Sequence, residues 1–135
     1  MAAMGMTIYA GRALCLPIPT PEKPHLFIAL NGARSYQETN IAFVNLTDFS
    51  SSRGFDKTIV LEPGCHEFIK KRTVVNYKDA LITTAAQVQT LVSTGKADFM
   101  DDFSGDILER IQMGALQSKY TPRKIQAMVK DYLCL

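Results

Sequence analysis

The chain has 135 residues, of which 47% are hydrophobic and 21% are charged. This length fits one domain, and the apolar fraction is that of a globular core rather than of a disordered or collagen-like chain. The net charge of +2 neither indicates nor excludes a nucleic-acid partner, because the distribution of charge along the chain matters more than its sum.

The N-terminal segment MAAMGMTIYAGR has no basic residue before its apolar part, so it is a poor secretory signal. The three cysteines, Cys15, Cys65 and Cys134, are odd in number and far apart in sequence, which argues against a disulfide framework or a clustered metal site. The apolar stretches are shorter than the roughly 18 residues of a membrane span. We therefore expect a cytoplasmic protein with reduced thiols, no membrane association, no metal and no other cofactor.

Residues 7–82 carry apolar runs separated by turn residues, which is typical of short strands. The proline-rich segment 17–24 is expected to be a stiff connection, because its four prolines do not fit a central strand. The predicted strands are 12–16, 25–30, 41–47, 58–61, 68–69, 73–77 and 80–82. This spacing favours a small, mostly antiparallel barrel or a strongly bent sheet.

Residues 83–135 are predicted to be helical, with an acidic and aromatic connector at 98–103. Thr83 or Thr84 is expected to cap a helix that Gly95 ends. Ser104 is expected to cap a second helix over 105–117, and Thr121 with Pro122 to start a third over 123–133. The sequence thus predicts one mainly β domain with C-terminal helices, of class α+β.

Charge is segregated along the chain. Residues 70–78 carry four basic side chains and no acid, residues 98–109 carry five acids and no base, and residues 110–130 carry five bases and no acid. The nearly neutral total therefore conceals basic and acidic blocks.

Two segments, HLFIAL at 25–30 and PGCHEFI at 63–69, are the most distinctive part of the sequence. With a Gly-led strand at 11–17, a Thr-ended strand at 44–47 and a closing helix at 104–116, they resemble the small SH3-like barrels of the MazF/PemK-type toxins. The similarity is closer to PemK-like proteins of unassigned role, whose motif is matched by Asp56, Thr58, Leu61, Gly64, His66, Phe68, Ile69, Thr73, Val75 and Tyr77.

This resemblance implies RNA binding, metal-independent endoribonuclease activity, a homodimer and an antitoxin-like protein or peptide as partner. It places Thr47 where the family has a functional Thr. The chain departs from the pattern at Lys23, where MazF-type nucleases have an Arg before the proline. Lys lacks the bidentate fork of Arg, so it fixes phosphate geometry less well, and Arg12 and Arg53 are candidate replacements.

Cleavage of RNA without a metal requires a base for the 2′-hydroxyl, an acid for the leaving oxygen and donors for the charged phosphorane. His25 and His66 are the two histidines and lie near predicted strand ends, so they are the candidate acid/base pair, with Thr47 as a phosphate donor. The candidate RNA-binding residues are Lys23, Arg53, Lys70, Lys71, Arg72 and Tyr77, the last for stacking a base.

Each of these residues also has a structural interpretation. The two histidines fit hydrogen-bonded structural positions, Thr47 fits a turn, and the Lys70 to Arg72 run fits a solvated turn. Tyr77 alternates with Val75, as a core residue does. The alternative hypothesis is therefore a non-catalytic barrel that binds a protein partner or a nucleic acid, and Lys23 favours it.

Overall fold

The computed structural model describes residues 7–20, 22–32, 40–49 and 56–135. Its strands are β1 (Ala13–Thr20), β2 (Lys23–Ala29), β3 (Asn40–Asp48), β4 (Val60–Leu61), β5 (Thr73–Thr84) and β6 (Asp98–Met100). Its helices are α1 (Ala85–Ser93), α2 (Gly105–Gln117) and α3 (Arg123–Leu133). None of the helices within these ranges is long and apolar enough to cross a membrane.

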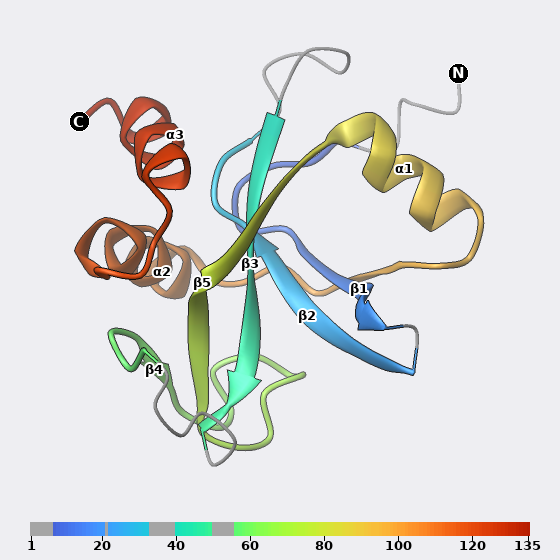
Figure 1. Cartoon of the computed structure of the whole chain (residues 1–135). Coiled ribbons are helices and arrows are strands. Elements are labelled where there is room, and N and C mark those ends of the chain that lie inside the picture. Colours follow the sequence, from blue (N-terminus) through green and yellow to red (C-terminus); the bar gives the residue numbers. More distant parts are fainter. Residues whose placement is uncertain (1–6, 21, 33–39, 50–55) are drawn as a thin grey trace.

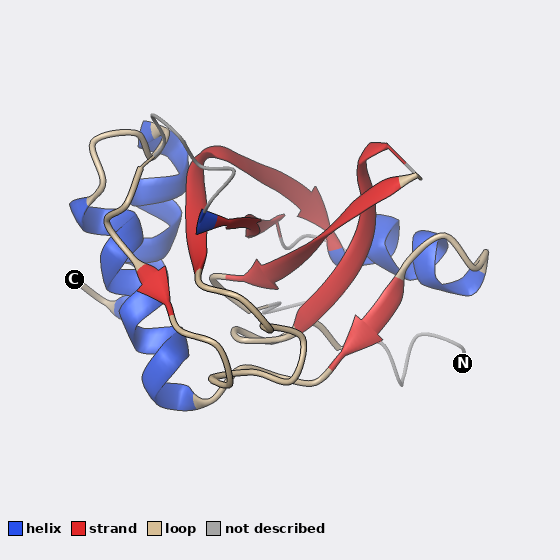
Figure 2. Ribbon diagram, turned by 90° about the horizontal axis from the view of Figure 1, so that it is seen from below, coloured by secondary structure: helices blue, strands red, loops and turns tan. Residues whose placement is uncertain are grey.

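The six strands form one antiparallel sheet in the order β4-β5-β3-β2-β1-β6. The sheet curls on itself, with α2 and α3 on one side and α1 on the other (Figures 1 and 2). This architecture confirms the predicted class, a small α+β domain with a barrel-like antiparallel sheet and C-terminal helices.

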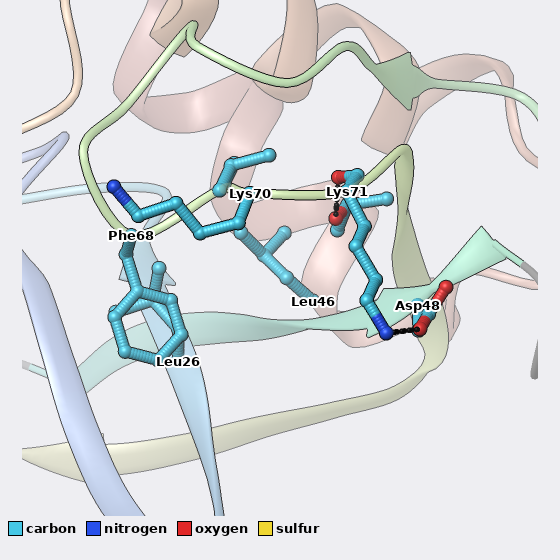
Figure 3. A pocket seen from close by; sticks show the side chains of 8 residues that line it. Leu26, Leu46, Asp48, Phe68, Lys70 and Lys71 are labelled. Atoms are coloured by element: carbon cyan, nitrogen blue, oxygen red, sulfur yellow. Dashed lines mark hydrogen bonds and ion pairs between the residues drawn. The ribbon is translucent and has the colours of Figure 1, made fainter.

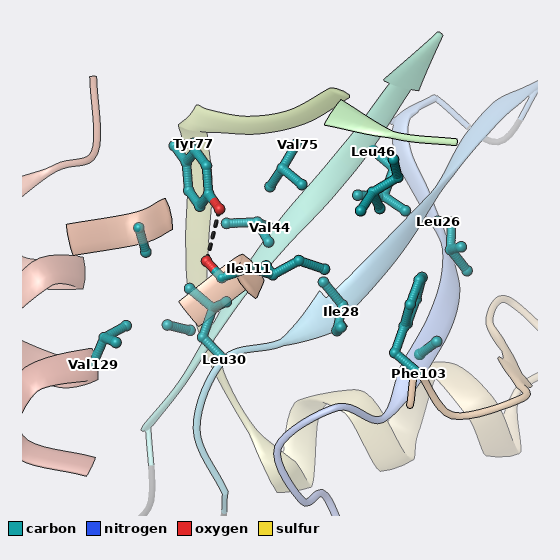
Figure 4. Close-up of a cluster of buried hydrophobic side chains, with 14 of the residues drawn as sticks. Leu26, Ile28, Leu30, Val44, Leu46, Val75, Tyr77, Phe103, Ile111 and Val129 are labelled. Carbon is teal, nitrogen blue, oxygen red and sulfur yellow. Dashed lines mark hydrogen bonds between the residues drawn. The ribbon is translucent and has the colours of Figure 1, made fainter. Parts of the chain in front are cut away.

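Side chains that alternate along the strands enter two separate cores, because successive residues of a strand point to opposite faces. On β2, Leu26 and Ile28 belong to a core that α2 and α3 cover, here called the α2–α3 core (Figure 4). Phe27 and Ala29 belong to a second core that α1 covers, here called the α1 core. A residue's parity on β2 or β3 therefore decides which side of the sheet its side chain reaches.

The prediction that the proline-rich segment 17–24 is a stiff connection is wrong, because most of it lies in strands. β1 continues through Pro17 and Pro19 to Thr20, and β2 already begins at Lys23. β6 pairs β1 only at residues 13–15, so beyond Cys15 the strand has one neighbour among the described residues, and its register against β2 shifts between Leu16 and Pro19. Prolines are tolerated at such an edge, where a missing N–H breaks no ladder bond.

Other strand boundaries also differ from expectation. The acidic connector forms β6, which pairs with β1, and residues 68–69 lie in a loop rather than a strand. The two strands predicted at 73–77 and 80–82 are one long strand, β5. Its register against β3 shifts between Phe43 and Asn45, so β5 carries extra residues there.

The helix starts mostly follow the predicted caps. Thr84 forms a capping box with Gln87, and Ser104 accepts a hydrogen bond from the Ile107 amide. Such caps are worth about 1 kcal/mol each. Gly95, at φ +75°, follows α1 as predicted. α3 differs, because Pro122 is its N-cap and the buried Thr121 hydroxyl makes no cap hydrogen bond.

Candidate functional site: a basic pocket at one end of the sheet

A pocket opens where β2 begins, β3 ends and β5 begins, on the α2–α3 side of the sheet (Figure 3). Its volume is about 240 Å³. The residues that line it are Leu26, Leu46, Asp48, Phe68, Ile69, Lys70, Lys71 and Thr73. An apolar floor thus meets a wall that carries both signs of charge.

Strand parity explains this composition. Leu26 of β2 and Leu46 of β3 belong to the α2–α3 core, and Asp48 lies two residues beyond Leu46 on the same face. Thr73 is the register partner of Asp48 on β5. The loop 68–71 then supplies the outer wall, where the Phe68 side chain is 45% exposed although it is large and apolar.

The three basic residues of this loop, Lys70, Lys71 and Arg72, differ in the ion pairs that they make within the protein. Lys71 faces Asp48 with Nζ to Oδ2 at 3.8 Å, and both side chains reach solvent. Arg72 pairs with Glu62 at 3.2 Å and lies over the Phe49 ring. Lys70 is exposed and makes no ion pair with any residue that the structure describes. Lys70 and Lys71 are therefore the cations most available to an incoming anion.

His66 holds the base of this loop. It is 6% exposed, its Nε2 lies 2.6 Å from the Asp101 carbonyl oxygen, and its Nδ1 lies 3.0 Å from the Phe68 amide nitrogen. The amide can only donate and the carbonyl can only accept, so Nδ1 accepts from the Phe68 amide and Nε2 donates to the Asp101 carbonyl. The ring also stacks on Phe103 with centroids 4.3 Å apart. His66 thus fastens the loop to the residues that follow β6.

His25 lies on the other side of the sheet. Its register partner Leu16 and its neighbour Phe27 belong to the α1 core, whereas His66 stacks on a residue of the α2–α3 core. His25 is partly exposed, and its Nδ1 lies 3.2 Å from the carbonyl oxygens of Ile18 and Lys23. The structure therefore does not bring the two histidines together as an acid/base pair.

Thr47 shares the face of His25. It lies two residues beyond Asn45, and His25 lies two residues before Phe27, which pairs with Asn45. The Thr47 hydroxyl has the Asn45 side-chain amide at 3.4 Å. Thr47 and His25 thus lie on one side of the β2 and β3 ends, and the pocket lies on the other.

The remaining predicted RNA-binding residues are placed less favourably. Tyr77 is fully buried and donates a hydrogen bond from its hydroxyl to the Ile111 carbonyl at 2.7 Å, so the predicted stacking on a base is wrong. Burial raises the pKa of Tyr77 well above its usual value. Lys23 is exposed beside the turn that joins β1 to β2, and Arg53 lies outside the described residues.

Neither thiol chemistry nor a metal centre is indicated in the part of the chain that the structure describes. The cysteines are free, and burial raises the pKa of Cys15 and Cys65. A raised pKa disfavours the reactive thiolate. Across residues 7–20, 22–32, 40–49 and 56–135, no three His, Cys, Asp or Glu side chains gather as metal ligands.

A second cavity, of about 580 Å³, is lined by Cys15, Pro17, Pro24, Gly95, Lys96 and Asp98. It brings together one cation, one carboxylate and an unactivated thiol, which is a weaker chemical signal than the basic pocket. The pocket residues that sequence reasoning missed are Leu26, Leu46, Asp48, Phe68, Ile69 and Thr73. For Phe68, a sequence signal was present: an aromatic residue lies two positions before the basic triplet at 70–72, and this pattern could have identified it as a site residue.

No protein-family model, curated protein or solved structure matches the chain at a significant level.

Proposed function

We propose that this chain is a PemK/MazF-like RNA-binding protein that holds single-stranded RNA at the basic pocket. The observation that carries the proposal is the exposed Phe68 ring beside Lys70 and Lys71, over an apolar floor. Proteins that bind single strands combine cations that follow the phosphates with aromatic side chains on which bases stack. The pocket offers both in one loop, and His66 fixes that loop to the rest of the fold.

Binding of short RNA, measured by fluorescence anisotropy at several salt concentrations, tests the proposal. In the Lys70→Ala/Lys71→Ala variant the affinity should fall most at low salt. Each lost phosphate contact should reduce the slope of log K against log salt by about 0.7, so the double variant should lose about 1.4. Phe68→Ala should weaken binding with little change in slope, because stacking releases no counterions.

The matched control is Lys124→Ala/Lys130→Ala, which removes the same charge from exposed positions of α3. This control should keep the wild-type slope. If both double variants lose affinity equally, binding reflects total charge and the pocket is not the site. If the wild-type protein binds no RNA at low salt, the RNA-binding proposal is wrong.

Metal-independent RNA cleavage is a second candidate function, favoured by the common face of His25 and Thr47. A partly exposed imidazole with a nearby hydroxyl can take a proton from a 2′-hydroxyl and donate a hydrogen bond to phosphate. Cleavage in the presence of a chelator, with 2′,3′-cyclic phosphate ends that disappear in His25→Ala and Thr47→Val, would support it. Persistence of cleavage in both variants, or its absence in the wild type, would contradict it.

A further inference from the structure

We infer that the basic pocket takes one unpaired guanine base and that Asp48 reads the edge of that base. This inference rests on the proposed RNA binding and adds to it a base specificity. Three properties of the pocket carry it: its size, its aromatic and apolar walls, and a carboxylate at its rim.

The size of the pocket limits its occupant. At about 240 Å³ it is smaller than the roughly 300 to 1,000 Å³ of pockets that enclose drug-sized ligands. It has room for one flat ring system, while a sugar and its phosphate stay outside. Lys70 and Lys71 stand at that outer rim, where a phosphate attached to a bound base would lie (Figure 3).

The walls suit a planar, weakly polar group. Phe68, Leu26 and Leu46 line the pocket together, and the two leucines are buried whereas Phe68 is exposed (Figure 3). Unpaired RNA bases are commonly recognised by stacking on an exposed aromatic side chain. Phe68 is already exposed, so binding requires no prior opening of the core.

Asp48 supplies the selectivity. An ionised carboxylate only accepts hydrogen bonds, and its two oxygens match two parallel donors. Among the four RNA bases, guanine alone carries two adjacent donors on its Watson–Crick edge, the ring N1–H and the 2-amino group. Adenine, cytosine and uracil each place an acceptor beside their donor, which would face a carboxylate oxygen.

The partners that Asp48 already has do not prevent this contact. Lys71 is 3.8 Å away, longer than a hydrogen bond, and Asp48 has further contacts within the protein. A carboxylate can accept about four hydrogen bonds, so Asp48 can also accept hydrogen bonds from a nucleobase. Lys71 can then turn from Asp48 toward the RNA phosphate, while the two donors of the base hydrogen-bond the Asp48 carboxylate.

An acidic peptide with an apolar anchor is the competing occupant, and it fits less well. Its apolar side chain would remove water from Asp48 without donating a hydrogen bond in place of that water. Its acidic groups would be attracted by Lys70 but repelled by Asp48. A guanine nucleotide instead presents donors to Asp48 and negative charge to the lysines.

The test measures the affinity of wild-type protein for oligouridine with a single central guanine, adenine, cytosine or inosine. One well-formed bidentate contact is worth about 1 to 3 kcal/mol of discrimination, so guanine should bind about tenfold more tightly than adenine. Inosine keeps N1–H but lacks the 2-amino group, so its affinity should fall between the two. This series needs no variant and is independent of any folding defect.

The Asp48→Asn variant tests the residue itself. Its amide replaces one acceptor with a donor, so the guanine preference, taken as the ratio of affinities for guanine-containing and all-uridine RNA in the same variant, should fall below about threefold. The control is Asp106→Asn, the same charge change in the first turn of α2, which should keep the preference.

Three outcomes would overturn the inference in distinguishable ways. If RNA binds but guanine has no advantage, or Asp48→Asn changes all oligonucleotides equally, base reading is wrong and the RNA-binding proposal stands. If no oligonucleotide binds, both fail. If a peptide of alternating Glu and Leu displaces RNA and loses affinity in Phe68→Ala, the pocket belongs to a protein partner.

Discussion

The two sides of the curled sheet use histidine in opposite ways. On the α2–α3 side, His66 is buried, stacked on Phe103 and hydrogen-bonded through both ring nitrogens to main-chain groups. On the α1 side, His25 is partly exposed, and the contacts of its ring both involve Nδ1. Both residues lie near strand ends in the sequence, yet one fastens the fold and the other remains accessible to a solute.

The comparison teaches that the chemistry of a histidine follows from its partners rather than from its position along a strand. A ring nitrogen engaged by a main-chain amide has no lone pair for a substrate proton. His66 therefore helps to position the loop that carries Phe68 and the lysines of the pocket wall. Chemistry that needs an exchanging proton is better placed on the α1 side.

The largest expected effect comes from removing the buried histidine. His66→Ala leaves the Asp101 carbonyl and the Phe68 amide without their partner and deletes the ring stacked on Phe103. At about 1 kcal/mol for each of the two part-buried hydrogen bonds and about 1 kcal/mol for the stack, we expect a loss of about 3 kcal/mol in the free energy of unfolding. Urea denaturation measures it.

His25→Ala is the matched control, with the same chemical change at a partly exposed site. It should cost less than about 1 kcal/mol, because substitutions at exposed sites rarely cost more. Similar losses in the two variants would break the contrast between the two sides of the sheet. His66→Ala should in addition weaken RNA binding at the pocket, because it releases the loop that carries Phe68.

A second prediction concerns the closest approach of α2 to the sheet. A methyl group on Gly114 would collide with the Tyr77 hydroxyl oxygen and with the Ile59 side chain. Overpacking of this kind costs about 1 to 3 kcal/mol, so we expect Gly114→Ala to destabilise the protein by about 2 kcal/mol in urea denaturation. Gly105→Ala, where a methyl group meets open space near the start of the same helix, is the control and should be nearly neutral.

Adding Tyr77→Phe sharpens this test. Alone it removes the hydrogen bond to the Ile111 carbonyl and should cost about 1 kcal/mol. In the Gly114→Ala background it also removes one of the two colliding groups, so the double variant should be more stable than the sum of the single losses predicts. Strict additivity would show that Ile59 alone causes the clash.

The elements of this fold that sequence predicts best are those with local signals. Thr84 and Ser104 each begin a helix because a side-chain oxygen accepts from an amide three residues on, and that pattern is visible in sequence. β6 could not be found in this way. It is only three residues long and is defined by its partner β1, which lies more than 80 residues away in the sequence.

The site was predicted only in part for the same reason. Lys70 and Lys71 were found because a basic run is a local feature, but Asp48 reaches the pocket only through its pairing with Thr73 on β5. Alternate residues of β2 and β3 point to opposite sides of the sheet. The sequence shows this alternation but does not show which set of residues faces the α1 core and which faces the α2–α3 core. The pairing of His25 with His66 failed on that point, since they lie on opposite sides.

The smallest predicted effect tests whether an ionised carboxylate, that of Asp56, also stabilises the α2–α3 side of the fold. Burial raises the pKa of Asp56, but hydrogen bonds from Ser118 and Thr58 outweigh it and bring the pKa below its usual value of 3.8. A pKa lower in the folded than in the unfolded state means that the charged form stabilises the fold. The contribution is complete above the unfolded-state pKa and is lost as the pH falls through the folded-state pKa.

Asp56 is only partly buried, so solvent weakens this stabilisation, which should be less than about 1 kcal/mol. Unfolding in urea at pH 6 and at pH 3 should show the wild type losing slightly more stability on acidification than Asp56→Asn, which has no proton to bind. Asp106→Asn, which makes the same substitution at an exposed position in the first turn of α2, is the matched control. If Asp56→Asn loses as much stability in acid as the wild type, the charge of Asp56 does not stabilise the contact between the residues before β4 and the end of α2.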